Sequence, residues 1–137
     1  MLVVAMVLFT ALAFLTVLFH LAFILFVIFG GLLVARHPRL LPVHFAAAAW
    51  GAYVSLANRI CPLTPLENWF RRRGGASGYT GDFLEHYLLA IIYPTGLTAS
   101  TQRVLGAAVI VLNAGVYLWL LRRRRMTPAV PVTPPEP

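Results

Sequence analysis

The sequence predicts an all-α membrane protein with four transmembrane helices and a short interfacial helix between the second and third spans. Hydrophobic residues make up 60% of the 137-residue chain and charged residues only 11%, whereas soluble domains carry about 25% charged residues. Residues 2–35 contain no charged side chain, and about 20 apolar residues suffice to cross a bilayer. All eleven basic residues are arginines at the ends of apolar segments, which is typical of membrane insertion rather than nucleic-acid binding.

The first span is expected at about residues 7–35. No basic residue precedes its apolar core, so we do not expect it to be a cleaved signal peptide. Small or polar side chains recur along one helical face, the kind of face that packs against other helices in lipid. We therefore expect His20 to point inward. That face contains Thr10, Ala13, Thr16, His20, Val27 and Gly31.

The second span is expected at about residues 42–60, because Pro42 suits a first helical turn and Cys61-Pro62 ends the apolar segment. Its small and polar residues follow a heptad-like spacing that is typical of a close interhelical contact. His44 starts this face near the outer membrane surface, where we interpret it as an interfacial residue. The face consists of His44, Ala48, Gly51, Ser55 and Asn58.

An interfacial helix is expected over residues 65–73, between the second and third spans. Thr64 suits the N-cap, Pro65 the first helical position and Glu67 the third, which together predict a capping box. Trp69 and the arginines that follow are residue types that favour a membrane surface. The Gly74-Gly75 pair is expected to end this helix.

The third span is expected at about residues 80–97. Asp82 and Glu85 lie in its first turns, where the helix dipole favours negative charge. The fourth span is expected at about residues 101–121, and its inward face is predicted to hold Gly106, Ile110, Asn113 and Tyr117.

The chain is thus expected to form one transmembrane domain over residues 1–125. Residues 126–137 contain five prolines and are predicted to be a disordered cytoplasmic tail. Four spans would place both termini and the loop near residue 70 on one side, with eight arginines against three on the other. Because cytoplasmic loops are rich in arginine, we expect both termini to be cytoplasmic in a bacterial inner membrane. The eight are Arg59, Arg71, Arg72, Arg73 and Arg122 to Arg125, and the three are Arg36, Arg39 and Arg103.

The run from Cys61 to Glu67, together with Gly78-Tyr79 and His86-Tyr87-Leu88, resembles the bacterial domain-of-unknown-function family 2784. The family pattern is also matched at His20, Gly30, Gly31 and Trp50. The resemblance covers about residues 5–122. It implies a small multi-pass bacterial membrane protein, and it implies no activity.

Four side chains of metal-binding type could converge, with Glu85 as a spare: His20, Cys61, Glu67 and His86. Histidine, cysteine and glutamate bind transition metals, and two facing histidines can hold haem iron. His20 is expected to lie about six residues deeper than His86. At 1.5 Å per residue this is a vertical gap of about 9 Å, which helix tilt could largely close.

The role favoured by the sequence is an accessory or scaffold protein, not an enzyme, with an inward polar network and no cofactor. The network residues are Thr64, Glu67, Glu85 and Asn113. One alternative is a redox protein that binds haem through His20 and His86, or a metal ion with Glu67 or Cys61 as further ligands. A second alternative is an enzyme that acts on lipid through His86 and Glu85. No catalytic residue is assigned, because no hydrolase, phosphate-binding or zinc motif occurs.

The expected partners are the lipid bilayer and a second copy of the chain or a larger membrane complex, without nucleic acid. Runs of arginine beside a membrane attract anionic headgroups. The arginines expected to contact anionic lipids are Arg71, Arg72, Arg73, Arg122, Arg123, Arg124 and Arg125.

Overall fold

The computed structural model describes residues 1–89 and 98–125. Its described residues form helices and no strand, which confirms the all-α class. In chain order the elements are α1 (Leu2–Arg36), the 3₁₀ helix η1 (Pro38–Leu40), α2 (Leu41–Leu56), α3 (Leu63–Arg73), the π-helix η2 (Leu84–Leu89) and α4 (Ala99–Arg125).

Two described helices, α1 and α4, are long and apolar enough to cross a membrane. Only 11% and 17% of the residues in their most apolar segments are buried, whereas a core helix of a soluble protein is mostly buried. The predicted number of four spans was wrong for the part of the chain that is described. α2 has 16 residues, or about 24 Å of helix at 1.5 Å per residue, against a hydrocarbon layer about 30 Å thick.

The predicted third span, residues 80–97, is described only as far as its π-helix. Residues 90–97, and the tail over residues 126–137, lie outside the described residues. A helix, α3, exists where the interfacial helix was expected over residues 65–73, and it begins slightly earlier, at Leu63.

α2 ends four residues before its predicted end because Asn58 adopts a left-handed conformation, with φ of 51°. The N–H of Asn58 donates to the carbonyl of Ser55, and the N–H of Arg59 donates to that of Val54. This is the hydrogen-bond pattern of a Schellman motif, in which asparagine is one of the few residues that fit the left-handed position. The polar face predicted to run through Asn58 therefore ends at Ser55.

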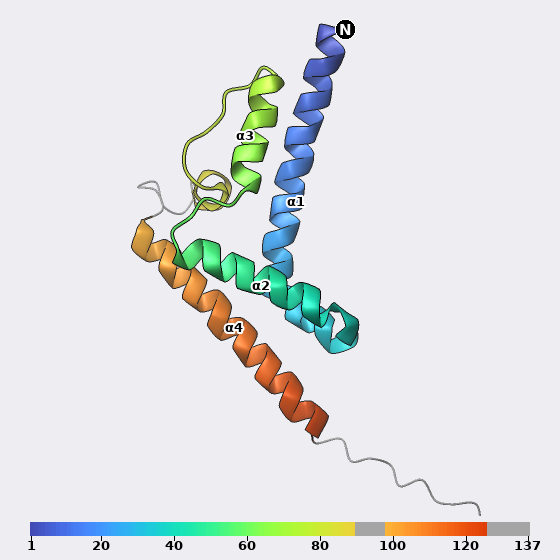
Figure 1. Cartoon of the computed structure of the whole chain (residues 1–137), viewed down its shortest axis with the longest axis vertical. Coiled ribbons are helices and arrows are strands. Elements are labelled where there is room, and N and C mark those ends of the chain that lie inside the picture. The colour runs from blue at the N-terminus through green and yellow to red at the C-terminus, as the bar shows by residue number, and fades with distance from the viewer. Residues whose placement is uncertain (90–97, 126–137) are drawn as a thin grey trace, which may run out of the picture.

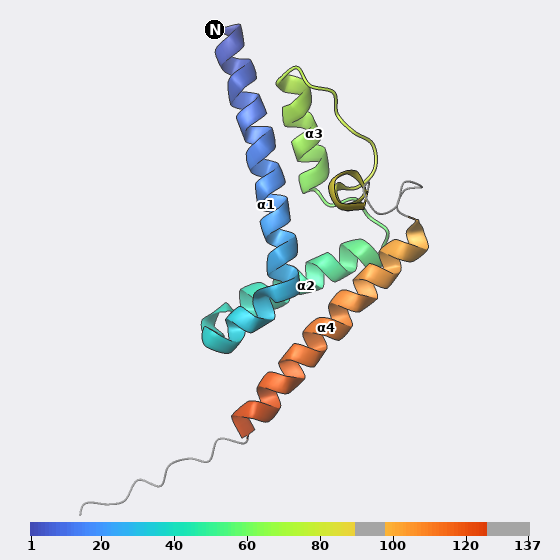
Figure 2. The same cartoon turned by 180° about the vertical axis from the view of Figure 1, so that it is seen from behind.

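α1 is the longest helix, and α3 and α2 pack against it, whereas α4 packs mainly against α2 (Figure 1). α3 lies beside its N-terminal half, where Trp69 packs edge-on against Phe9 with ring centroids 5.8 Å apart. α2 and α4 lie against the C-terminal half, as the reverse view also shows (Figure 2). We call these two parts the α3 region, which includes residues 74–87, and the crossing region.

Small residues allow α1 and its neighbours to approach closely in the crossing region. A Cβ added at Gly30 would collide with the His44 ring of α2, and one added at Gly31 would lie 2.8 Å from Val116 Cγ1 of α4. In the same region, Asn113 Nδ2 of α4 donates a hydrogen bond to the Val27 carbonyl of α1. Since residue numbers increase together along both helices at these contacts, α4 and the C-terminal part of α1 run in the same direction.

Candidate functional site

The buried residues of α3 are polar, whereas its exposed residues include the apolar Leu66 and Trp69 in the first turns and Arg72 and Arg73 at the C-terminal end. Thr64, Glu67 and Asn68 are buried, with Glu67 at 0% exposure, whereas Leu66 and Trp69 are 43% and 40% exposed. A helix on the surface of a soluble protein has the opposite arrangement. The inverted arrangement of α3 suits a hydrocarbon environment, because polar groups there must be satisfied inside the protein.

Glu67 is the centre of a hydrogen-bonded cluster. Tyr79 donates its hydroxyl to Glu67 Oε2 at 2.8 Å, and Tyr87 donates to Oε1 at 2.6 Å. Arg71, one turn later on α3, donates to the Tyr87 hydroxyl at 3.0 Å and lies 3.7 Å from Oε1. Both carboxylate oxygens are thus partnered and a guanidinium balances the charge, which is the condition under which buried carboxylates are stable.

The same cluster fixes the loop that follows α3. The Asn68 amide donates to the Tyr79 carbonyl at 3.0 Å and accepts the Tyr79 N–H at 2.9 Å. Arg71 Nε donates to the Ser77 carbonyl at 3.1 Å. The loop can turn back because Gly75, with φ of +83°, ends α3, as the Gly74-Gly75 pair predicted. α3 and its loop therefore form one hydrogen-bonded unit.

The predicted capping box does not form. α3 begins at Leu63 with Pro62 as N-cap and no side-chain cap, so Thr64 and Glu67 are free to point into the protein. Burial raises the pKa of Tyr79 well above its ordinary value, and the hydrogen bond to Glu67 is the second cause. Tyr79 therefore remains a hydroxyl donor at physiological pH.

A second polar group joins the α3 region to α4 through Asp82, which is 9% exposed. Its Oδ1 accepts the Phe83 N–H at 2.7 Å and lies 3.5 Å from the Thr64 hydroxyl. Its Oδ2 accepts from Gln102 of α4 at 3.2 Å. Sequence reasoning had treated Asp82 only as a partner of a helix dipole.

His20 points inward as predicted and is 4% exposed. Its ring stacks on Phe83 with centroids 4.1 Å apart, and its Nδ1 has no hydrogen-bond partner among the described residues. His20, Cys61 and Asp82 line one cavity of about 60 Å³. Burial raises the pKa of the Cys61 thiol, so this cysteine is a poor thiolate ligand at neutral pH.

His86 does not share that cavity. It is exposed and stacks face to face on Tyr79 with centroids 3.8 Å apart. Both carboxylate oxygens of Glu67 already accept hydrogen bonds from Tyr79 and Tyr87, and Arg71 lies beside them. Across residues 1–89 and 98–125, no three His, Cys, Asp or Glu side chains are grouped as a metal site would require.

The crossing region contains a buried histidine that the sequence interpretation placed at the membrane surface. His44 has 0% exposure, and its Nδ1 lies 2.6 Å from the Tyr117 hydroxyl. The ring sits over Gly30, where any side chain would exclude it. The Gly30-Gly31 pair and the predicted inward face of the last span, which included Tyr117, were the signals that could have located this contact.

Asn113 points inward as predicted, but it belongs to the crossing region rather than to the Glu67 cluster. Its Nδ2 donates to the carbonyls of Val27 at 3.1 Å and Val109 at 2.9 Å. The predicted polar network is therefore divided: Thr64 and Glu67 lie in the α3 region and Asn113 lies across the molecule. Glu85 is half-buried near Gly81, and no hydrogen bond of its side chain appears in the described part.

Comparison with known protein families gives a match over most of the chain. The sequence profile of DUF2784, a protein family of unknown function, matches residues 10–118. The match spans most of α1 and α4 and everything between them, so both regions of the molecule belong to the family pattern. No curated protein and no solved structure matches the chain significantly.

Proposed function

The chain belongs to the DUF2784 family of unknown function, and on that premise we propose that it is an integral membrane protein with an accessory, non-enzymatic role in a bacterial inner membrane. The observation that carries this proposal is the inverted face of α3. A polar cluster around Glu67 is enclosed, while Leu66 and Trp69 face outward. This arrangement is stable when the surroundings are hydrocarbon and costly when they are water.

The use of the polar groups supports an accessory role. Glu67, Asn68 and Arg71 all bind other parts of the same chain. A catalytic carboxylate would instead need an open side toward a substrate. The large outward faces of α1 and α4 are apolar and can contact lipid or the helices of a partner protein.

The alternative of haem or metal binding through His20 and His86 has less support. Each imidazole stacks on a different aromatic ring, Phe83 for His20 and Tyr79 for His86. His20 is buried, whereas His86 is exposed. Joint ligation would require both stacks to break.

We also propose that the two termini lie on opposite sides of the membrane. α4 and the C-terminal part of α1 run in the same direction, so their C-terminal ends share one end of the molecule (Figures 1 and 2). That end carries six arginines, Arg36, Arg39 and residues 122–125, and the remaining five are Arg59, Arg71 to Arg73 and Arg103. Beside the two long helices themselves, the C-terminal ends have all six, whereas the N-terminal end of α1 has none and that of α4 has only Arg103. The positive-inside rule then favours a cytoplasmic C-terminus. The prediction of two cytoplasmic termini assumed four crossings.

Tags at either end test this arrangement in spheroplasts. We expect protease added outside to remove an N-terminal tag and to spare a C-terminal tag until the cells are lysed. Protection of both tags would favour two cytoplasmic termini. It would contradict the proposal that α1 and α4 both cross the membrane in the same direction.

Photo-crosslinking in living cells tests the accessory role. A photoreactive residue would replace Phe19 or Phe29 on α1, or Val111 on α4, which are 62%, 56% and 72% exposed. We expect a protein adduct of one fixed mass from at least one of these positions. Lipid adducts alone at all three positions would contradict an accessory role, although they would agree with membrane insertion.

A further inference from the structure

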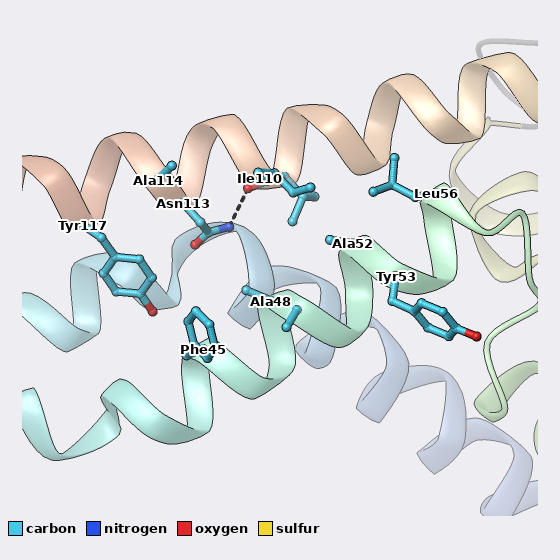
Figure 3. A pocket seen from close by; sticks show the side chains of 11 residues that line it. Phe45, Ala48, Ala52, Tyr53, Leu56, Ile110, Asn113, Ala114 and Tyr117 are labelled. Atoms are coloured by element: carbon cyan, nitrogen blue, oxygen red, sulfur yellow. Dashed lines mark hydrogen bonds between the residues drawn. The ribbon is translucent and has the colours of Figure 1, made fainter.

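We propose that the pocket between α2 and α4 binds a neutral, lipid-like molecule whose polar end is a hydrogen-bond donor, such as a long-chain alcohol. The pocket has a volume of about 650 Å³, within the range of about 300–1,000 Å³ that is usual for small-molecule sites. Its lining is almost entirely apolar and is drawn in Figure 3. This site is separate from the Glu67 cluster and goes beyond the accessory role.

The side chain that selects the ligand is Asn113, which is 6% exposed and lines the pocket. Its amide orientation is fixed, because Nδ2 faces two carbonyl oxygens, Val27 O and Val109 O, which can only accept. Its Oδ1 is buried and has no hydrogen-bond partner among the described residues. Figure 3 shows this oxygen on the side of Phe45 and Tyr117, between α4 and α2.

An unpartnered amide oxygen in an apolar environment loses free energy that a donor would restore. Hydrocarbon chains cannot supply a donor. The backbone of another membrane helix cannot either, because its N–H groups are already bonded within that helix. A ligand with a hydroxyl at one end and an apolar body fits the walls, and its hydroxyl reaches the buried oxygen when the side chains that cover Oδ1 shift.

The charge of the lining indicates that the ligand is neutral. The eleven lining residues include no arginine, aspartate or glutamate, and an unpaired ion would be costly here. The polar groups at this end of the pocket are Asn113 and Tyr117, whose hydroxyl contacts His44 at 2.6 Å. A single terminal hydroxyl matches this small polar end.

Native mass spectrometry of the full chain in detergent tests the proposal. The probes are 1-hexadecanol and its methyl ether, which has the same chain and an oxygen acceptor but no donor. We expect one alcohol molecule to bind per chain, about tenfold more tightly than the ether, the effect of one buried hydrogen bond. Equal affinity for alcohol and ether would overturn the proposal.

Two variants locate the binding. Asn113→Leu removes the acceptor and should abolish the preference for alcohol over ether. Ala114→Phe places a ring in the pocket from an exposed position and should weaken alcohol binding at least tenfold. The matched control is Ala107→Phe, an exposed alanine two turns earlier on α4 that is not part of the lining, and it should bind alcohol like the wild type.

Ala114→Phe decides the outcome if Asn113→Leu does not fold. Unchanged alcohol binding in Ala114→Phe, or equal losses in Ala114→Phe and Ala107→Phe, would overturn the site. A dimer that Ala114→Phe disrupts, seen without bound alcohol, would also overturn it and would assign the pocket to a second copy of the chain.

Discussion

The α3 region and the crossing region stabilise the fold in different ways. In the α3 region, Glu67, Asn68 and Arg71 each bond to side chains or backbone atoms between residues 77 and 87. In the crossing region, small residues bring helices together and leave His44 Nε2 and Asn113 Oδ1 without partners in the described part of the chain. The Glu67 cluster thus uses its polar groups for structure, whereas the crossing region holds the oxygen that the proposed ligand would meet. Against the α3 region, His20 Nδ1 beside Phe83 is also without a partner in the described part of the chain.

This difference follows from how each region is connected. The α3 partners are 6 to 20 residues apart in sequence, so the chain that follows α3 can satisfy them all. The crossing region joins residues up to 86 apart, and its helices meet through packing. Packed helices leave a pocket where their axes diverge, whereas a loop folds down onto the helix that it follows.

The largest effect is expected at Glu67. Glu67→Ala leaves two tyrosine hydroxyls and Arg71 without their shared acceptor, and should lower the free energy of unfolding in detergent by about 3–5 kcal/mol. Glu67→Gln keeps one acceptor oxygen and should cost about 1–2 kcal/mol. The matched control Glu85→Ala should change it by less than about 0.5 kcal/mol. Equal losses at Glu67 and Glu85 would remove the distinction between the two carboxylates.

A smaller effect is expected from the close contact at Gly30 in the crossing region. Gly30→Ala places a methyl group in the His44 ring and should cost about 1–3 kcal/mol, the usual range for overpacking. Gly115→Ala is the control, because a Cβ there meets nothing within 4 Å. It should be neutral or stabilising by up to about 1 kcal/mol, because alanine favours helix. If both variants behave alike, the α1–α2 approach is looser than described.

The smallest effect is expected at the end of α2. Asn58→Ala forces alanine into a left-handed conformation and should cost about 1 kcal/mol, whereas Asn58→Gly should be close to neutral. The same unfolding assay measures both. A neutral Asn58→Ala would mean that α2 continues beyond Leu56, as the sequence pattern had predicted.

The sequence allowed the helical class, the family and several inward residues to be predicted. Uncharged apolar length identified α1 and α4, and the spacing of small residues placed His20 and Asn113 on inward faces. Gly74-Gly75 correctly marked the end of α3, because that signal is local. These features depend on neighbours within a few turns of one helix.

Features that depend on distant partners were missed. Glu67 and Thr64 matched a capping box, but their partners Tyr79, Tyr87 and Asp82 lie beyond a loop whose course no local pattern reveals. His44 was assigned to the membrane surface because the fourth span's Tyr117, 73 residues away, could not be positioned against it. The length of α2 was overestimated because Asn58 fits an inward helical face and also a left-handed helix end.

The central claim is that α3 turns its apolar face to hydrocarbon while its polar face is satisfied within the protein. Spin labels at Leu66→Cys and Trp69→Cys, in a Cys61→Ser chain reconstituted in liposomes, test it most directly. A label at Arg72→Cys, on the exposed end of α3, is the comparison. We predict that the labels at 66 and 69 collide readily with oxygen and rarely with a water-soluble nickel complex, whereas the label at 72 collides with nickel. Nickel accessibility at 66 and 69 equal to that at 72 would place α3 in water and contradict the account.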